Sequence, residues 1–136
     1  MPQPEFRAKA VIEATVSPSE DPGKVAEALR NVAGGHIETE SSDAASVRLV
    51  TGDPGAFAHL KEQLRDRHIR SAARRQLLLN RRGKETSLML NRQAAAAGVV
   101  ALCGSPGESP LGPIYLTIVS DGLDAVVDWL SSYLEG

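Results

Sequence analysis

Apolar and polar residues alternate near the start of the chain with the period of a β-strand. Across residues 6–16, one face carries only apolar side chains, and the other carries polar side chains except at Val11. Successive side chains of a strand point to opposite sides, so this pattern predicts a strand with one buried face. The apolar positions are Phe6, Ala8, Ala10, Ile12, Ala14 and Val16.

Two Asp-Pro-Gly tripeptides, at residues 21–23 and 53–55, predict the starts of helices. An aspartate accepts hydrogen bonds from the first free amides of a helix, and proline suits the first helical position. Apolar residues at helical spacing follow the first tripeptide, and Gly34-Gly35 ends that helix. Residues 36–40 and 46–51 then predict two strands around a Ser-Ser-Asp turn.

The segment after the second tripeptide carries two apolar stripes that disagree in direction. The stripe of residues 57–64 and the stripe of residues 69–77 are displaced by roughly 150° if one helix runs at 100° per residue. One straight helix cannot aim both stripes at the same core. The sequence therefore predicts a break within two residues of Arg67-His68, and two consecutive helices.

The last third of the chain predicts three more strands and a closing helix. An alanine-rich helical turn separates the first two strands, and a Gly/Pro/Ser-rich loop precedes the third. Ser120 or Asp121 caps the closing helix, whose inward residues are Leu123, Val126, Val127, Leu130 and Leu134. The strands are residues 86–90, 98–103 and 114–119, the turn is residues 93–97 and the loop is residues 104–112.

Hairpin connections dominate this order of elements. They predict an α+β fold, with a mostly antiparallel sheet and helices packed on one face. The 136 residues suit one domain over residues 1–136. No apolar run approaches the ~20 residues of a membrane span, and no signal peptide is visible, so no membrane partner is expected. The single cysteine, Cys103, cannot form an internal disulfide, which favours a cytoplasmic location.

The formal net charge of -2 hides a strong asymmetry along the chain. Residues 61–92 hold ten Lys or Arg against three Asp or Glu, whereas the rest of the chain holds five against fourteen. No acid lies between Arg67 and Lys84, although solvated helix faces normally interleave both signs. The uncompensated charge predicts a polyanion partner. A plain solvated face, or an acidic patch of the same molecule or of a second copy, is the competing interpretation.

Candidate phosphate-binding residues follow from helical spacing. Arg67, Arg70, Arg74 and Arg81 fall on one flank of the second of the two helices, away from its apolar face. Arginine binds phosphate oxygens through two parallel hydrogen bonds, so this flank suits RNA. All five aromatic residues fall on or beside apolar stripes, which favours phosphate contacts with structured RNA over base stacking. The flank is extended by Arg82, Lys84 and Arg92.

Catalytic signatures are weak. The histidines His36, His59 and His68 are scattered without metal-ligand spacing, and Cys103 at the end of an apolar strand is expected to be a small buried residue. The loop of residues 104–112 lacks the Gly-Lys-Ser/Thr ending of a phosphate-binding loop. We therefore expect no enzymatic activity, no cofactor and no metal.

Two stretches carry a resemblance to a known family. "LNRQAAAAG", residues 90–98, followed by "SPLGPIYLTI", residues 109–118, resembles an archaeal family of uncharacterised proteins labelled predicted RNA-binding, whose genes often neighbour dephospho-CoA kinase. "RHIRSAARRQLL", residues 67–78, is similar to the Arg-Ile-x-x-Ala-Arg helix of that family. The resemblance implies an α+β fold similar to that of the fifth large-subunit ribosomal protein, an archaeal cytoplasmic origin and RNA as ligand. The family brings no established catalytic residues.

The tripeptide Asn91-Arg92-Gln93 has two interpretations. It caps the following helical turn and hydrogen-bonds the crossing backbone, or Arg92 and Gln93 join the basic segment as one phosphate-binding rim. The leading functional hypothesis is a non-catalytic RNA-binding domain. The alternative is a protein-interaction or homodimeric module whose basic helix docks on an acidic surface.

Overall fold

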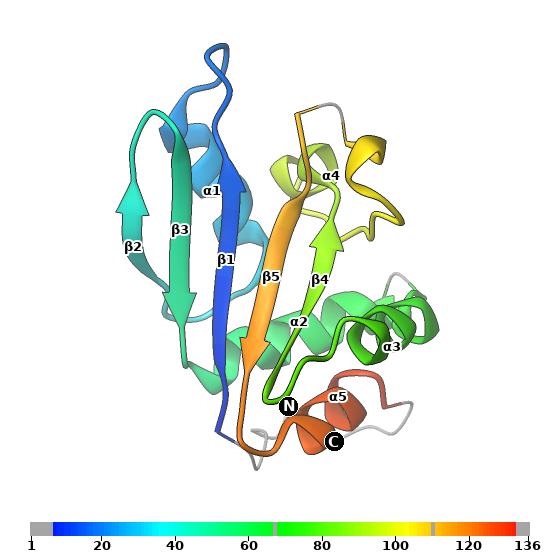
Figure 1. Cartoon of the computed structure of the whole chain (residues 1–136). Helices are drawn as coiled ribbons and strands as arrows, with labels where there is room; N and C mark the ends of the chain where they lie inside the picture. Colours follow the sequence, from blue (N-terminus) through cyan, green and yellow to red (C-terminus); the bar gives the residue numbers. More distant parts are fainter. Residues whose placement is uncertain (1–6, 67, 110, 133–136) are drawn as a thin grey trace.

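Five antiparallel strands form one sheet in the order β2-β3-β1-β5-β4 (Figure 1). The structure is a computed structural model that describes residues 7–66, 68–109 and 111–132. Its elements are β1 (Lys9–Thr15), α1 (Pro22–Val32), β2 (Glu38–Ser42), β3 (Ser46–Thr51), α2 (Pro54–Asp66), α3 (Arg70–Leu79), β4 (Glu85–Leu90), α4 (Arg92–Ala96), a 3-10 turn (Pro106–Glu108), β5 (Ile114–Val119) and α5 (Leu123–Leu130). The predicted α+β class with an antiparallel sheet and helices is confirmed.

The sheet buries one face, and the alternate residues of each strand lie on the other, more exposed face. In β1, Ala10, Ile12 and Ala14 are buried and face the helices, as the alternating pattern predicts. The equivalent positions of β3, β4 and β5 are also buried. Figure 1 shows α1 and α2 behind the strands, so the core lies between the sheet and these helices.

The other side of the sheet, called the open face here, carries the alternate set of side chains. All of them are at least partly exposed except Val11, which its neighbours cover. Tyr115 lies on this face with 38% exposure, beside the buried stripe of β5 rather than on it. The open face consists of Lys9, Val11 and Glu13 of β1, Arg48 and Val50 of β3, Glu85, Ser87 and Met89 of β4, and Tyr115, Thr117 and Val119 of β5.

Side chains of α3 cover the outer edge of β4. Gln76 donates to the Cys103 carbonyl and accepts from the Met89 amide, and Asn80 donates to the Ser87 carbonyl. The strand predicted for residues 98–103 is wrong, since this segment makes only an isolated bridge between Leu90 and Leu102. The amides and carbonyls on that edge of β4 are shared between α3 and residues 101–103, which leaves no room for a full strand.

The predicted helix break is confirmed. α2 ends at Asp66 and α3 begins at Arg70, and His68 between them has a φ of 57°. A non-glycine residue in this left-handed conformation is uncommon, and here it lets the two helices aim their separate apolar stripes at one core. Residue 67 lies outside the described part of the chain.

Both Asp-Pro-Gly tripeptides start helices as predicted. Asp21 accepts a hydrogen bond from the Gly23 amide, and Asp53 accepts one from the Gly55 amide. The closing helix differs from its prediction, because its N-cap is Gly122 without a side-chain cap bond. The Ser120 hydroxyl instead accepts a hydrogen bond from the amide of Gly122, the residue just before the helix. Among the described residues, no helix is long and apolar enough to cross a membrane.

Candidate nucleic-acid interface

Six of the basic residues lie together on α3 and on the turn that follows it. Arg70 and Arg74 lie on α3 as predicted, but Arg81 lies beyond its last residue, in the turn with Arg82 and Lys84. Arg67 lies outside the described residues. Arg75, also on α3, is exposed. We call the set the basic surface, and its members are Arg70, Arg74, Arg75, Arg81, Arg82 and Lys84.

Carboxylates at the start and along one side of α5 meet this surface. The Arg74 guanidinium donates to Asp128 over 2.8 Å and to the Ser131 hydroxyl over 3.1 Å. Arg81 pairs with Asp124. Lys84 Nζ lies 2.8 Å from Asp121 Oδ1. The acidic patch of the same molecule, one of the competing interpretations of the basic segment, is thus present.

The spacing of these acids was a signal available in the sequence. Asp124 and Asp128 follow Asp121 by three and seven residues. This spacing places the three aspartates on one side of a helix, away from the apolar residues of α5. What the sequence could not tell is that α5 packs against α3 rather than elsewhere on the core. That contact depends on the tertiary arrangement.

The ion pairs between α3 and α5 are solvent-exposed. The Lys84 ammonium, through its hydrogen bond and its charge, lowers the pKa of the Asp121 carboxyl, and Asp121 raises the pKa of Lys84 in return. The side chain of Asp124 is 80% exposed and that of Asp128 is 68% exposed. Ion pairs between exposed side chains are weak because water and salt screen both charges. Another anion can therefore replace the carboxylates at little cost.

The α5 acids leave a positive surplus. Among the described residues, three aspartates pair with Arg74, Arg81 and Lys84 of the basic surface. Arg75 and Arg82 are exposed and have no acidic partner within the described part of the chain. The surplus of positive charge lies on α3 and the turn after it, next to the ion pairs whose carboxylates another anion can replace.

Arg92 does not belong to this surface, so its prediction as a phosphate-binding residue is wrong. Its side chain is only 6% exposed, and its Nη1 lies 2.6 Å from Glu20 Oε1 in the segment before α1. Its Nε and Nη2 atoms are buried without a hydrogen-bond partner. Burial of Glu20 by itself raises its pKa, but the Ser17 amide and the Arg92 guanidinium outweigh that effect and lower the pKa.

The structural interpretation of Asn91-Arg92-Gln93 is confirmed for Asn91, which caps α4 by accepting from the Ala94 amide over 2.9 Å. Gln93 is exposed, but Arg92 beside it is buried, so the two do not form one rim. A separation of 72 residues between Arg92 and Glu20 gives no spacing signal, so sequence reasoning could not identify this pair.

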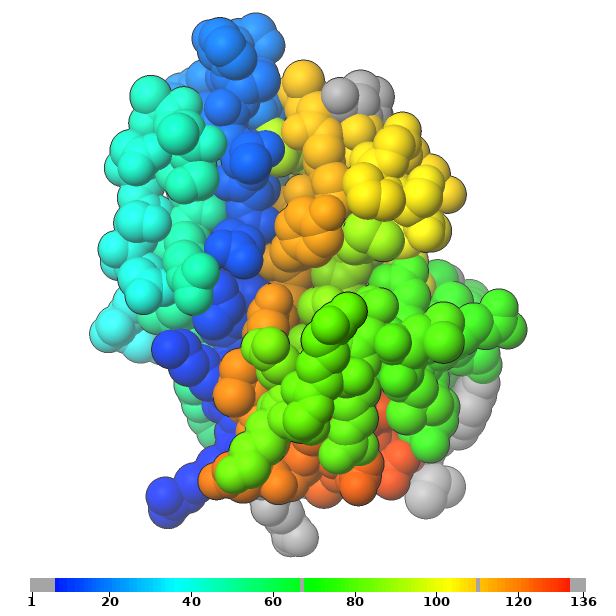
Figure 2. Space-filling view, viewed as in Figure 1, coloured from blue at the N-terminus to red at the C-terminus, as the bar shows by residue number. Residues whose placement is uncertain are grey.

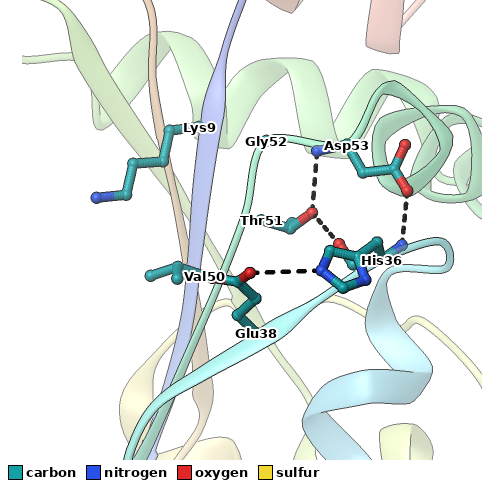
Figure 3. A pocket seen from close by; sticks show the side chains of 7 residues that line it. All are labelled: Lys9, His36, Glu38, Val50, Thr51, Gly52 and Asp53. Carbon is teal, nitrogen blue, oxygen red and sulfur yellow. Dashed lines mark hydrogen bonds and ion pairs between the residues drawn. The ribbon is translucent and has the colours of Figure 1, made fainter.

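A groove of about 600 Å³ opens at one end of the sheet beside β2 and β3 (Figure 3). Asp53 accepts from the His36 amide over 2.6 Å, and the Thr51 hydroxyl donates to the His36 carbonyl over 2.6 Å. Hydrogen bonds from the His36 and Gly55 amides lower the pKa of the Asp53 carboxyl. These polar groups hold the loop before β2, and Figure 3 shows Lys9 extending away from them.

His36 and Cys103, two candidate residues for chemistry in the described part of the chain, lie in different surroundings. The His36 imidazole lies 3.4 Å from Glu38 on an exposed rim. Cys103 is buried, as predicted, and burial together with the charge of Glu108 raises the pKa of its thiol. A raised pKa keeps the thiol protonated and unreactive at neutral pH. In residues 7–66, 68–109 and 111–132, no group of three or more His, Cys, Asp or Glu side chains could hold a metal ion.

Comparison with known proteins gives relatives that match most of the chain. A UPF0201 protein of Sulfurisphaera tokodaii is 38% identical over 127 residues, which cover 90% of this chain and 86% of that protein. A UPF0201 protein of Methanothermobacter thermautotrophicus is 40% identical over 123 residues, with 90% of each chain covered. No protein-family model matches the chain.

Solved structures share the fold. An uncharacterized UPF0201 protein superposes with a TM-score of 0.78 at 26% identity, covering 94% of this chain and 97% of that one. The UPF0201 protein from Methanococcus jannaschii has a TM-score of 0.73 at 26% identity, covering 90% of this chain and 98% of that one. Protein AF2318, described as DUF54, has a TM-score of 0.71 at 16% identity over 93% of this chain and 99% of that one, which shows the fold alone.

Proposed function

This chain belongs to the UPF0201 family of archaeal proteins, and we propose that it is a non-catalytic RNA-binding protein that contacts phosphates through the basic surface. The observation that carries the proposal is the positive surplus on α3 and its turn. Arg75 on α3 and Arg82 in the turn after it are exposed and have no acidic partner among the described residues.

The ion pairs with α5 prepare the other cations for phosphate. A carboxylate and a phosphate offer the same kind of oxygen acceptor to a guanidinium, and Asp128 already holds Arg74 in an exposed, hydrogen-bonded position. Exposed pairs contribute little to stability, so RNA phosphates can replace the aspartates without unfolding the contact between α3 and α5. The ligand is a structured RNA, since shape and phosphate contacts need no stacking platform.

Two features outside the basic surface support RNA as the polyanion. The stretches of residues 90–98 and 109–118 resemble a family labelled predicted RNA-binding. The same resemblance implies a fold similar to that of the fifth large-subunit ribosomal protein, which also suggests RNA as the ligand. Both are arguments from similarity and add to the charge argument without replacing it.

Titration of a labelled RNA hairpin by fluorescence anisotropy at several salt concentrations tests the proposal. Contact with about four to six phosphates predicts that log K falls against log salt with a slope of roughly -3 to -5. In the double variant Arg75→Ala/Arg82→Ala the slope is shallower by about one to two units, and binding of all RNA sequences weakens similarly.

The matched control is Lys24→Ala/Arg30→Ala, which removes two exposed cations from α1, a helix that packs against β1 and β3 rather than β4. This control leaves the slope unchanged, although it changes the net charge by the same amount. Absence of binding even at low salt, or an equal loss in both double variants, overturns the proposal.

A further inference from the structure

We propose that the open face of the sheet is the interface of a homodimer, with a second copy of this chain as its occupant. The helices cover the other face, and Figure 2 shows strands β3, β1 and β5 at the surface on this side. The proposal concerns a different surface from the basic one and does not depend on RNA binding.

Apolar side chains run across the middle of the open face. Strand pairing places Val50 beside Val11 and Val11 beside Thr117, so the three form one row across β3, β1 and β5. Tyr115 and Val119 flank this row on β5, each with 38% exposure. Val50, Tyr115 and Val119 are therefore apolar side chains that this face exposes, around the buried Val11. An apolar cluster at the centre of a sheet, with charges around it, is typical of a protein–protein interface.

Helix α3 extends the apolar cluster beyond β4. Gln76 and Asn80 face the outer edge of β4, and Leu77 faces the core. At 100° per residue, Leu79 therefore projects from α3 on the side of the open face. Its exposure of 77% is the largest of any large hydrophobic residue in the described part of the chain. An exposed leucine beside the apolar row fits a surface that a partner covers.

The charges on the face are complementary to themselves under two-fold symmetry. Along β1, Lys9 lies one row to one side of Val11, and Glu13 lies one row to the other side. A two-fold axis that crosses the strands through the row of Val11 places Lys9 opposite the partner's Glu13. The same axis places Val119 opposite the partner's Tyr115 and brings Val11 against its own copy. A symmetric dimer needs a patch that complements itself in this way.

The charge balance of these contacts also favours a second copy. Arg48 lies 3.1 Å from Glu13 and 2.6 Å from Glu40, so the three side chains together carry one negative charge. Lys9 is exposed and has no acidic partner among the residues described. Two copies related by this axis form two contacts, each between one unpaired lysine and one cluster with a surplus of negative charge.

The size of the face is close to that of a small dimer interface. Five strands about 4.8 Å apart, with six residues and a length of about 20 Å on average, cover roughly 480 Å² of flat area. Two such faces bury roughly 960 Å² in total before side-chain relief is counted, near the roughly 1,000 Å² that a specific interface needs.

Sedimentation of the full chain between about 1 and 100 μM measures the dimer, at twice the monomer mass of 14.4 kDa. Tyr115→Lys places a charge in the apolar cluster and weakens dimerisation at least about tenfold. Lys9→Glu does the same by opposing the partner's Glu13 cluster, and Lys9→Glu/Glu13→Lys restores the dimer by exchanging the two charges. Lys24→Glu, the same charge reversal on α1, leaves the equilibrium unchanged.

Three results would contradict the proposed dimer. Wild-type protein that stays monomeric at about 100 μM has no such interface. A dimer that neither Tyr115→Lys nor Lys9→Glu weakens forms through another surface. A Lys9→Glu/Glu13→Lys variant that stays monomeric while its circular dichroism matches the wild type excludes the two-fold arrangement. Lys9 is exposed, so its variant tests the interface without disturbing the core.

Discussion

Arg92 and Arg74 are two arginines of the same basic segment, each bonded to a carboxylate far away in the sequence, yet they lie in opposite environments. Arg92 is buried and joins α4 to the segment before α1 through Glu20. Arg74 lies at the surface and joins α3 to α5 through Asp128. The contrast shows that a surplus of charge along a sequence mixes structural cations with surface cations, and that burial separates the two groups.

The largest expected effect follows from breaking the buried pair. Arg92→Ala leaves Glu20 without its partner in a largely dehydrated site, so the free energy of unfolding falls by about 3–5 kcal/mol. Urea denaturation measures the change, with Arg75→Ala as the exposed control that stays within about 0.5 kcal/mol of the wild type. The double variant Arg92→Met/Glu20→Leu regains much of the loss, because two apolar side chains leave no uncompensated charge. Equal stability of Arg92→Ala and the wild type contradicts a structural role.

Removal of the carboxylates of the exposed ion pairs is expected to change the affinity for RNA rather than the stability of the fold. Asp121→Asn/Asp124→Asn/Asp128→Asn removes the carboxylates that compete with phosphate. We expect RNA affinity to rise about tenfold or more at low salt, with a salt slope steeper by up to about three units. The control Glu27→Gln/Glu38→Gln/Glu62→Gln removes three exposed acids elsewhere. A comparable rise in this control would show that only net charge matters.

The pH dependence of stability sharpens the same contrast. The folded protein lowers the pKa of Glu20 below its ordinary value of 4.5. The stabilisation is therefore fully present above about pH 4.5 and is lost as the pH falls through the folded pKa. Denaturation midpoints between pH 7 and pH 3 measure it, with Glu20→Gln as reference. A wild-type curve parallel to that of Glu20→Gln would show that Glu20 does not contribute.

The smallest effect is expected for the surface pair itself. A double-mutant cycle of Arg74→Ala and Asp128→Ala yields a coupling free energy of about 0.2–1 kcal/mol, because both side chains are largely exposed. Addition of about 1 M salt reduces this coupling by screening. A coupling as large as the loss in Arg92→Ala would remove the difference between the two regions.

Local patterns predicted the elements of the fold, because their signals lie within a few residues. The strand at β1 followed from a period of two, both Asp-Pro-Gly starts were correct, and the conflict of apolar stripes located the break near His68. The strand of residues 98–103 failed because α3 takes part of the edge of β4 that a strand would need. Edge competition depends on packing and leaves no periodic signal.

The candidate site was predictable only in part. The charge count located Arg70, Arg74, Arg81, Arg82 and Lys84 on one surface, but it assigned Arg92 to the same set. Spacing along a helix predicts which side chains share a face and gives no information on which remote carboxylate each one meets. The pairs with α5 and with Glu20 join residues that are more than 35 positions apart, so they appear only in the folded chain.

The central position of β1 sets the order in which the sheet can be completed. β1 lies between β3 and β5, and about 100 residues separate it from β5. At about 5–20 residues per second, β1 waits roughly 5–20 s on the ribosome before β5 is synthesised. During this interval the β2–β3 hairpin can pair with β1, while the other edge of β1 stays available for wrong partners. Pairing over such a long separation slows closure of the sheet, so a chaperone that protects the unpaired edge of β1 during synthesis would raise the yield of folded protein.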